Sequence, residues 1–195
     1  KIWGENDMEG VRLERLSKTY PGGKRALKGV TRRLNPGEVF GFLGPNGAGK
    51  TTTVKMLAGM ALPSGGSCQV LGIDPAQRPE KVHALAGVVT EHAQMYDSLT
   101  GLENLRFYGA AFGLSPSECE SRAKALLRQL ALAEAEHRRL AAPSTGLRQR
   151  LSLARALLPR PQVPLLDAPP SAPDPDTHPT APRLLRGPAG PAGIA

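Results

Sequence analysis

The alternation of hydrophobic and polar residues divides the chain into predicted strands and helices. Apolar and polar side chains alternate over residues 11–16 and again over 26–34, which predicts two half-buried strands. Short apolar runs predict further strands over 39–43, 69–73, 86–89 and 163–166. Apolar residues at helical spacing predict helices over 52–60, 102–112, 121–140 and 147–158. This order favours an α/β fold with a helical insertion, although the helices could instead form a separate interaction module.

Composition separates the last 37 residues from the rest of the chain. Eleven of the 19 prolines lie from Pro159 onward, whereas all eight aromatic residues lie at or before Phe112. The net charge of +8 also belongs to the first 158 residues, since three arginines balance three aspartates beyond them. We therefore expect one globular segment followed by a Pro/Gly-rich tail that does not fold in the same way.

Several classes of protein are not expected from these features. No apolar run approaches the ~18 residues that a membrane helix needs. The sequence opens at Lys1 without the charged-then-apolar leader of secreted proteins, and the start at Lys1 with Met8 inside indicates a fragment or an extended reading frame. Cys68 and Cys119 lack metal-binding spacing and fit a reduced cytoplasmic setting. The basic charge fits an anionic partner, which charge alone leaves open among nucleotide, nucleic acid and lipid headgroups.

One glycine-rich segment carries a phosphate-binding pattern between a predicted strand and a predicted helix. It matches G-x-x-x-x-G-K-[ST] with Gly44, Pro45, Asn46, Gly47, Ala48, Gly49, Lys50 and Thr51. The glycines let successive backbone N–H groups point at phosphate oxygens, and the helix N-terminus adds its positive end. The Lys50 ammonium can reach the β- and γ-phosphates, and the Thr51 hydroxyl can bind Mg²⁺. The alternative, a chance glycine-rich turn, does not account for the two correct flanks.

A second motif narrows the many classes of P-loop protein. Ser144, Thr145, Gly146 and Leu147 lead into the helix predicted over 147–158. This segment resembles the signature motif of ATP-binding cassette (ABC) proteins, in the form often seen in exporters. A hydroxyl, a glycine and a helix N-terminus can cap the γ-phosphate of a nucleotide held by a second subunit. Without the P-loop ahead of it, Ser144 or Thr145 would be interpreted as an ordinary helix N-cap.

The resemblance runs from about Val11 to Leu158, and it implies roles for further residues in family order. Tyr20 matches the aromatic residue that stacks on adenine, and Thr52, directly after the P-loop pattern, is counted among the nucleotide-binding residues. From position alone, an ordinary tyrosine that flanks a turn explains Tyr20 equally well. Glu91 stands where the family has Gln, and Asp167 matches the carboxylate that holds Mg²⁺ through water, so the implied metal ligands are Thr51, Glu91 and Asp167.

The pattern fails after Asp167. Ala168 occupies the position of the catalytic Glu, and a methyl group cannot orient a water, which commonly costs ~10²–10⁴ in rate. Pro164 interrupts the expected strand, and the segment with the closing strand and the switch His is not recognisable in the tail. No residue is therefore assigned a catalytic role, and hydrolysis by this chain alone is expected to be impaired.

The resemblance implies an α/β P-loop cassette with a parallel core sheet, an antiparallel N-terminal β subdomain and a helical subdomain, incomplete at its C-terminal end. The expected organisation is an extension over 1–10, the ATP-binding domain over 11–158 with its helical subdomain at about 92–150, and a degenerate region and tail over 159–195.

The implied function is that of the ATP-binding subunit of an exporter of the drug or antibiotic group. It would bind ATP and Mg²⁺, pair with a second cassette in a homo- or heterodimer, and serve a separate membrane permease from the cytoplasmic face. Nucleic acid is not expected as a partner, since the basic residues lack interleaved aromatics. Two alternatives remain open: a non-transport ABC ATPase acting on nucleic acid or the ribosome, and a degenerate nucleotide binder without hydrolysis.

Overall fold

The structure is a computed structural model that describes residues 10–36, 38–40, 47–89, 95–140, 144–167 and 193–194. These residues form two compact units. The first combines the described residues up to 88 with 162–167 and 193–194, and the second covers those between 89 and 161. Each unit is described by itself.

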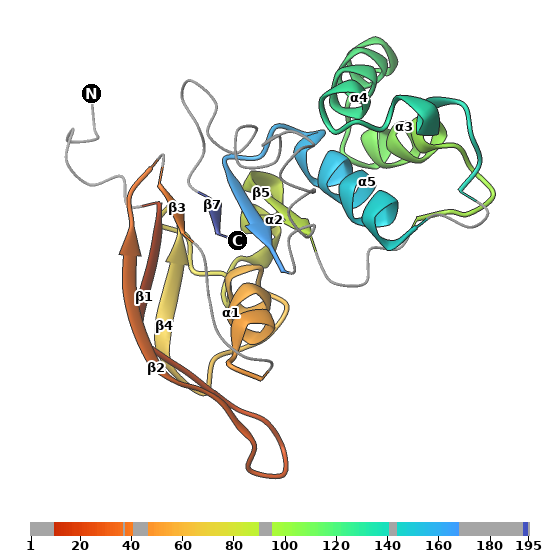
Figure 1. Ribbon diagram of the computed structural model, residues 1–195. Coiled ribbons are helices and arrows are strands. Elements are labelled where there is room, and N and C mark those ends of the chain that lie inside the picture. Colours follow the sequence, from red (N-terminus) through yellow and green to blue (C-terminus); the bar gives the residue numbers. More distant parts are fainter. Residues whose placement is uncertain are drawn as a thin grey trace, which may run out of the picture. The chain divides into compact units, whose positions relative to one another are not determined.

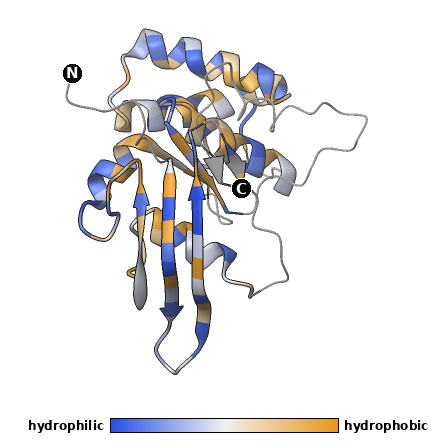
Figure 2. Ribbon diagram, turned by 90° about the vertical axis from the view of Figure 1, so that its left-hand side faces the viewer, coloured by the Kyte–Doolittle hydropathy of each residue, from blue (hydrophilic) through white to orange (hydrophobic). Residues whose placement is uncertain are grey.

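An antiparallel sheet of long strands forms one part of the first unit (Figure 1). Strand β1 (Val11–Thr19) lies between β2 (Arg25–Leu34) and β4 (Gly65–Val70). Hydrophobic and hydrophilic residues alternate along the strands, as Figure 2 shows, and the apolar set is buried, including Val11, Leu13 and Leu34. The period of two places these side chains on one face, so both alternating stretches predicted as strands are confirmed.

A four-stranded sheet in the order β3-β7-β6-β5 forms the other part of the first unit. Its strands are β3 (Val39–Phe40), β5 (Ala86–Val89), β6 (Val163–Leu166) and β7 (Gly193–Ile194). Strand β7 pairs in parallel with both β3 and β6. Helix α1 (Lys50–Leu57) contacts β6, and α2 (Pro79–Leu85) precedes β5. Val54, Met56 and Leu57 of α1 join Val163 and Leu165 in the buried core.

The described residues of the second unit form three α-helices and a short 3₁₀ helix. They are α3 (Gly101–Ala111), α4 (Pro116–Gln129), η1 (Ala133–Glu136) and α5 (Thr145–Leu157). Each α-helix contacts the other two. Helices α3 and α4 approach closely at Gly109, where a Cβ atom would lie 2.2 Å from the sulfur of Cys119. Leu105, Ala123, Leu127, Leu151 and Leu153 are buried, which gives this unit an apolar interior.

The predicted helix over 121–140 is wrong in extent. Helix α4 begins five residues earlier at Pro116, after the N-cap Ser115, and ends at Gln129. Ala131 then adopts a positive φ of 52°, a conformation that non-glycine residues rarely take. The Arg150 guanidinium from α5 donates to the carbonyl oxygens of Leu130 and Ala131, at 3.2 and 3.1 Å. A contact from a helix further along the chain therefore accompanies this end, which local periodicity cannot reveal.

Two smaller predictions need correction. The strand expected over 69–73 runs over Gly65–Val70 instead. The sequence did not indicate the start of this strand, because glycine is a poor strand former. Glycine is needed there because a Cβ atom at Gly66 would lie 2.3 Å from the carbonyl oxygen of Arg15 on β1. Helix α2 was not predicted, since its seven residues are too few to show a period.

The C-terminal region also departs from expectation. Pro164 was expected to interrupt its strand, but it lies buried inside β6. The closing strand was expected to be missing, but Gly193–Ile194 forms β7 between β3 and β6. Strand pairing needs only backbone groups, so a glycine-rich sequence can supply a short strand without the alternation that predicts one.

Candidate functional site

The N-terminus of α1 carries the part of the P-loop pattern that the structure describes. Gly47 and Gly49 have positive φ angles of 84° and 89°, and Gly49 is the N-cap of the helix. A Cβ atom at Gly49 would lie 2.5 Å from the carbonyl oxygen of Ala26, so the backbone packs where no side chain fits. The first turn of α1 contains no acidic residue, and no side chain in the described part of the structure caps it, so its amide end and Lys50 favour an anion.

Two oxygen-bearing side chains from distant parts of the sequence meet beside this helix. The Thr51 hydroxyl donates a hydrogen bond of 2.8 Å to Oδ1 of Asp167, across 116 residues of sequence. Asp167 follows directly after β6, whose four residues are all buried, and is itself only 7% exposed. A hydroxyl and a carboxylate are hard oxygen ligands of the kind Mg²⁺ prefers, so the pair fits the predicted metal site.

An aromatic ring lies close to the same helix. Tyr20 follows β1, and its hydroxyl lies 3.4 Å from the Thr52 hydroxyl. The Lys18 ammonium lies 5.3 Å from the centre of the ring. The structure therefore brings Tyr20, Thr51, Thr52 and Asp167 of the predicted set together within the first unit.

The predicted signature segment opens α5 in the second unit. Ser144 is the N-cap, and its hydroxyl accepts a hydrogen bond of 3.2 Å from the backbone N–H of Leu147. The helix predicted over 147–158 is present, but it begins two residues earlier, at Thr145, and ends at Leu157. Ser144, Thr145 and Gly146 are exposed, so the segment is open to a ligand or a partner.

Sequence reasoning overlooked the arginines that anchor α5. Arg148 forms an ion pair of 2.9 Å with Asp97, and the Arg155 guanidinium lies 4.9 Å from the centre of the Tyr108 ring. Arg150 holds the end of α4, as described above, and also donates to the Gly146 carbonyl at 3.4 Å. The cluster of three arginines in one short helix was visible in the sequence, but their partners were not.

Three aromatic residues, Tyr96, Phe107 and Tyr108, form what we call the aromatic patch. Their ring centres are 4.9 Å apart between Tyr96 and Phe107 and 5.3 Å apart between Phe107 and Tyr108, both with edge-to-face geometry. Tyr96 is 46% exposed and Phe107 is 49% exposed. Large exposed aromatics grouped in this way are typical of interaction surfaces.

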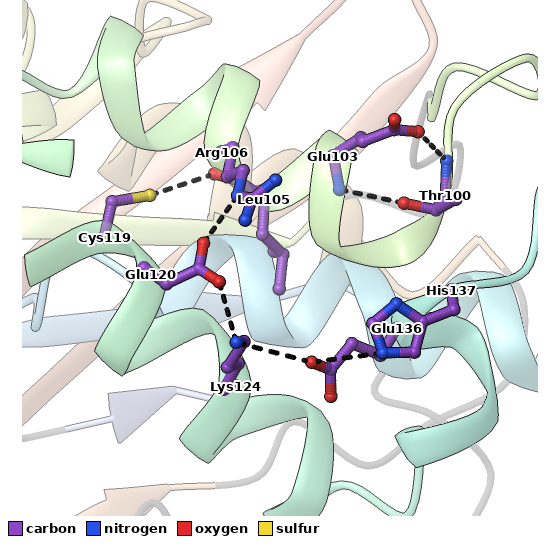
Figure 3. A network of polar contacts seen from close by, with 9 residues as sticks. All are labelled: Thr100, Glu103, Leu105, Arg106, Cys119, Glu120, Lys124, Glu136 and His137. Carbon is purple, nitrogen blue, oxygen red and sulfur yellow. Dashed lines mark hydrogen bonds and ion pairs between the residues drawn. The ribbon is translucent and has the colours of Figure 1, made fainter. Parts of the chain in front are cut away.

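Charged residues of α3, α4 and η1 form a polar network on the second unit (Figure 3). Hydrogen bonds from Arg106 and Lys124 lower the pKa of Glu120 to about 2. Glu136 continues the network by pairing with Lys124 and His137. Thr100 and Glu103 form a capping box at the start of α3, and its hydrogen bonds lower the pKa of Glu103. The network braces the surface of the helices and contains no residue of the predicted site.

The two cysteines are buried in different units. Burial raises the pKa of the Cys68 thiol to about 11, with Asp74 adding to the effect. Burial also raises the pKa of the Cys119 thiol. Both thiols are therefore protonated near neutral pH.

Several predicted residues lie outside the described part of the chain, namely Gly44, Pro45, Asn46, Glu91 and Ala168. Within the described ranges, no group of three or more His, Cys, Asp or Glu side chains could hold a metal ion. Among the described helices, none has the length and apolar character needed to cross a membrane.

The comparisons with known proteins agree with the geometry. Residues 27–171 match the family model described as "ABC transporter". The daunorubicin resistance ATP-binding protein DrrA2 of Streptomyces coeruleorubidus is 40% identical over 169 residues, which cover 87% of this chain and 52% of that protein. Nod factor export ATP-binding protein I of Paraburkholderia xenovorans is 37% identical over 168 residues, covering 86% of this chain and 55% of that protein. The chain thus spans about half the length of these relatives.

The fold is also similar to that of a solved ATP-binding cassette. A dimeric structure of such a cassette in a post-hydrolysis state, bound to ADP and Pi, superposes with a TM-score of 0.82 at 26% identity. The match covers 94% of this chain and 86% of that one. Its mixed α/β fold with an antiparallel β subdomain and a helical region is the architecture expected from the sequence.

Proposed function

This chain belongs to the ABC transporter family, and from that premise we propose that it is the ATP-binding subunit of an exporter, binding ATP with Mg²⁺. The observation that carries the proposal is the hydrogen bond between Thr51 and Asp167. These two residues are distant in sequence, are two of the three predicted Mg²⁺ ligands, and meet at the N-terminus of the helix that follows the P-loop pattern. Mg²⁺ would neutralise charge on the β- and γ-phosphates when bound.

The chain's own residues have distinct tasks in this proposal. The first-turn amides of α1 and the Lys50 ammonium bind the phosphates, and Gly49 lets the backbone approach them closely. The Tyr20 ring stacks on the adenine base. Thr51, Glu91 and Asp167 would hold Mg²⁺, Asp167 through a water molecule.

Equilibrium binding of a fluorescent ATP analogue to the purified chain tests this function. We expect Lys50→Ala to weaken binding at least tenfold, because it removes the cation that faces the phosphates. Lys55→Ala, at the other end of the same helix, is the matched control and should bind as the parent does. Tyr20→Ala should weaken binding more than Tyr20→Phe, which keeps a ring to stack on adenine. Equal affinities for the Lys50 and Lys55 variants would contradict the proposal.

Pairing with a second cassette follows from the signature segment. The exposed Ser144, Thr145 and Gly146 at the start of α5 suit the γ-phosphate of a nucleotide held by another subunit. The dimeric state of the solved cassette supports this assignment. Sedimentation of the chain with and without MgATP measures it, and Ser144→Arg, which blocks the helix start, should abolish the nucleotide-dependent dimer.

A separate membrane permease is the second proposed partner, reached from the cytoplasmic face of the membrane. The names of the relatives, which concern drug resistance and Nod factor export, favour an exporter. The aromatic patch on the second unit is the surface we assign to this contact, because Tyr96 and Phe107 are large and half exposed. In this proposal the ATP-binding domain spans 11–158, with the helical subdomain at about 92–150.

Hydrolysis by this chain is proposed to be impaired because Ala168 replaces the catalytic Glu. A single methyl group cannot accept a proton from the attacking water. Phosphate release by the parent should therefore be slower than that of Ala168→Glu by ~10²-fold or more, while their affinities for the ATP analogue stay similar. Equal turnover by the two proteins would contradict this reasoning.

A further inference from the structure

Helix α5 joins the signature segment to the part of the chain that carries the aromatic patch. Arg148 lies one turn after Ser144, and its backbone N–H donates to the Ser144 carbonyl at 3.0 Å. The Arg148 guanidinium pairs with the Asp97 carboxylate at 2.9 Å. Asp97 directly follows Tyr96, a member of the patch. A single side chain thus spans the distance between the two features.

The segment that contains Tyr96 and Asp97 is fixed to α3. Asn104 is fully buried, accepts a hydrogen bond of 2.9 Å from the Tyr96 N–H and donates one of 3.1 Å to the Tyr96 carbonyl. A buried amide that satisfies both backbone groups of one residue leaves that residue little freedom. Tyr96 and Asp97 are therefore held as part of the α3 surface.

A second contact connects helix α5, which begins with the signature segment, to the aromatic patch. Arg155, two turns after Arg148, lies over the ring of Tyr108, which packs edge-to-face against Phe107. Helix α5 therefore contacts the patch region through two cationic side chains. Displacing the patch moves both contacts at once.

Resting on the function proposed above, we infer that Arg148 is a positioning residue that links the aromatic patch to the signature segment. The Arg148 side chain is 35% exposed and that of Asp97 53%, so water weakens their pair in the isolated chain. A partner that covers the patch excludes this water, strengthens the pair and fixes the first turn of α5. The linkage is reciprocal, so a γ-phosphate bound at Ser144 also orders the patch.

Hydrogen exchange of the full chain, measured by mass spectrometry with and without MgATP, tests the link. In the parent we expect MgATP to slow exchange at the start of α1, in α5 and over residues 95–112. Asp97→Asn and Arg148→Gln should keep the slowing at α1 but reduce it over 95–112 at least threefold. Arg148→Lys, which retains the charge, should preserve most of it. Arg128→Gln, which removes an exposed arginine of α4, is the matched control and should behave as the parent.

The outcomes separate the link from the function on which it rests. Slowing over 95–112 that persists undiminished in Asp97→Asn would overturn the inference, as would its absence from a parent that shows slowing at α1. An absence of slowing at α1 as well would overturn the proposed function, and the inference with it. Thermal melting of each variant checks its folding. The melting temperature should change little, because an exposed ion pair such as that between Arg148 and Asp97 contributes little to stability.

Discussion

Replacing Thr51 by valine should lower the free energy of opening of the first unit by the contribution of one hydrogen bond. Valine keeps the size and branching of threonine but removes the hydroxyl that donates to Asp167 at 2.8 Å. Hydrogen bonds to charged groups contribute about 1.5–3 kcal/mol, and Asp167 is nearly buried, so water cannot fully replace the lost donor. We expect the free energy of opening of this unit to fall by that amount.

The two buried cysteines provide an assay that reads each unit separately. Cys68 reacts with a thiol reagent only when the first unit opens, and Cys119 only when the second does. A loss of about 1.5–3 kcal/mol should speed labelling of Cys68 roughly 10- to 150-fold. Labelling of Cys119 should keep its parental rate and is the internal control.

A double-mutant cycle isolates the contact from other effects of the substitution. In the Asp167→Ala background the hydroxyl has lost its acceptor, so adding Thr51→Val should change the Cys68 labelling rate less than about twofold. The reasoning is refuted if Thr51→Val accelerates Cys68 labelling equally in both backgrounds, or by less than threefold in the parent.

Three further predictions concern other parts of the structure. Gly49→Ala should weaken binding of the ATP analogue at least tenfold because its Cβ would collide with the backbone of β2, whereas Gly47→Ala, at a similar φ but in open space, should have a smaller effect. Because its pKa is lowered to about 2, Glu120 stabilises the fold fully above about pH 4.5 and loses this contribution as the pH falls towards 2. The difference in urea midpoint between the parent and Glu120→Gln should therefore shrink over that pH range. A difference that stays constant would contradict this prediction. Gly109→Ala should force α3 and α4 apart, cost about 1–3 kcal/mol and speed labelling of Cys119, which unchanged labelling would disprove.

Local patterns were sufficient to predict the elements whose cause is local. The strands β1 and β2 follow from the alternation of apolar and polar residues, although β1 has a register shift between Leu13 and Leu16. Helix α5 follows from the N-cap Ser144 with apolar residues at helical spacing behind it. The P-loop pattern fixed the start of α1 to within two residues. In each case the residues that determine the element lie inside it or immediately before it.

Features that depend on distant contacts could not be predicted in this way. Helix α4 ends where Arg150 reaches it from α5, and β7 exists because β3 and β6 offer backbone partners to Gly193–Ile194. The meeting of Thr51 and Asp167 was implied by the family resemblance, not by spacing. The ion pair between Arg148 and Asp97 had no sequence signal, since each residue alone is an ordinary charged surface position.

The separation of Thr51 and Asp167 in the sequence has a consequence for how the protein folds during its synthesis on the ribosome. Strands β1, β2 and β4 lie within the first 70 residues and can pair early, but Thr51 must wait for a partner 116 residues further along. At about 5–20 residues per second, that wait lasts roughly 6–23 s. During this time the apolar face of α1 has no β6 to cover it. The nascent chain therefore passes through a stage in which the antiparallel sheet can form while α1 is still unsupported, and holding by a chaperone is most useful at this stage.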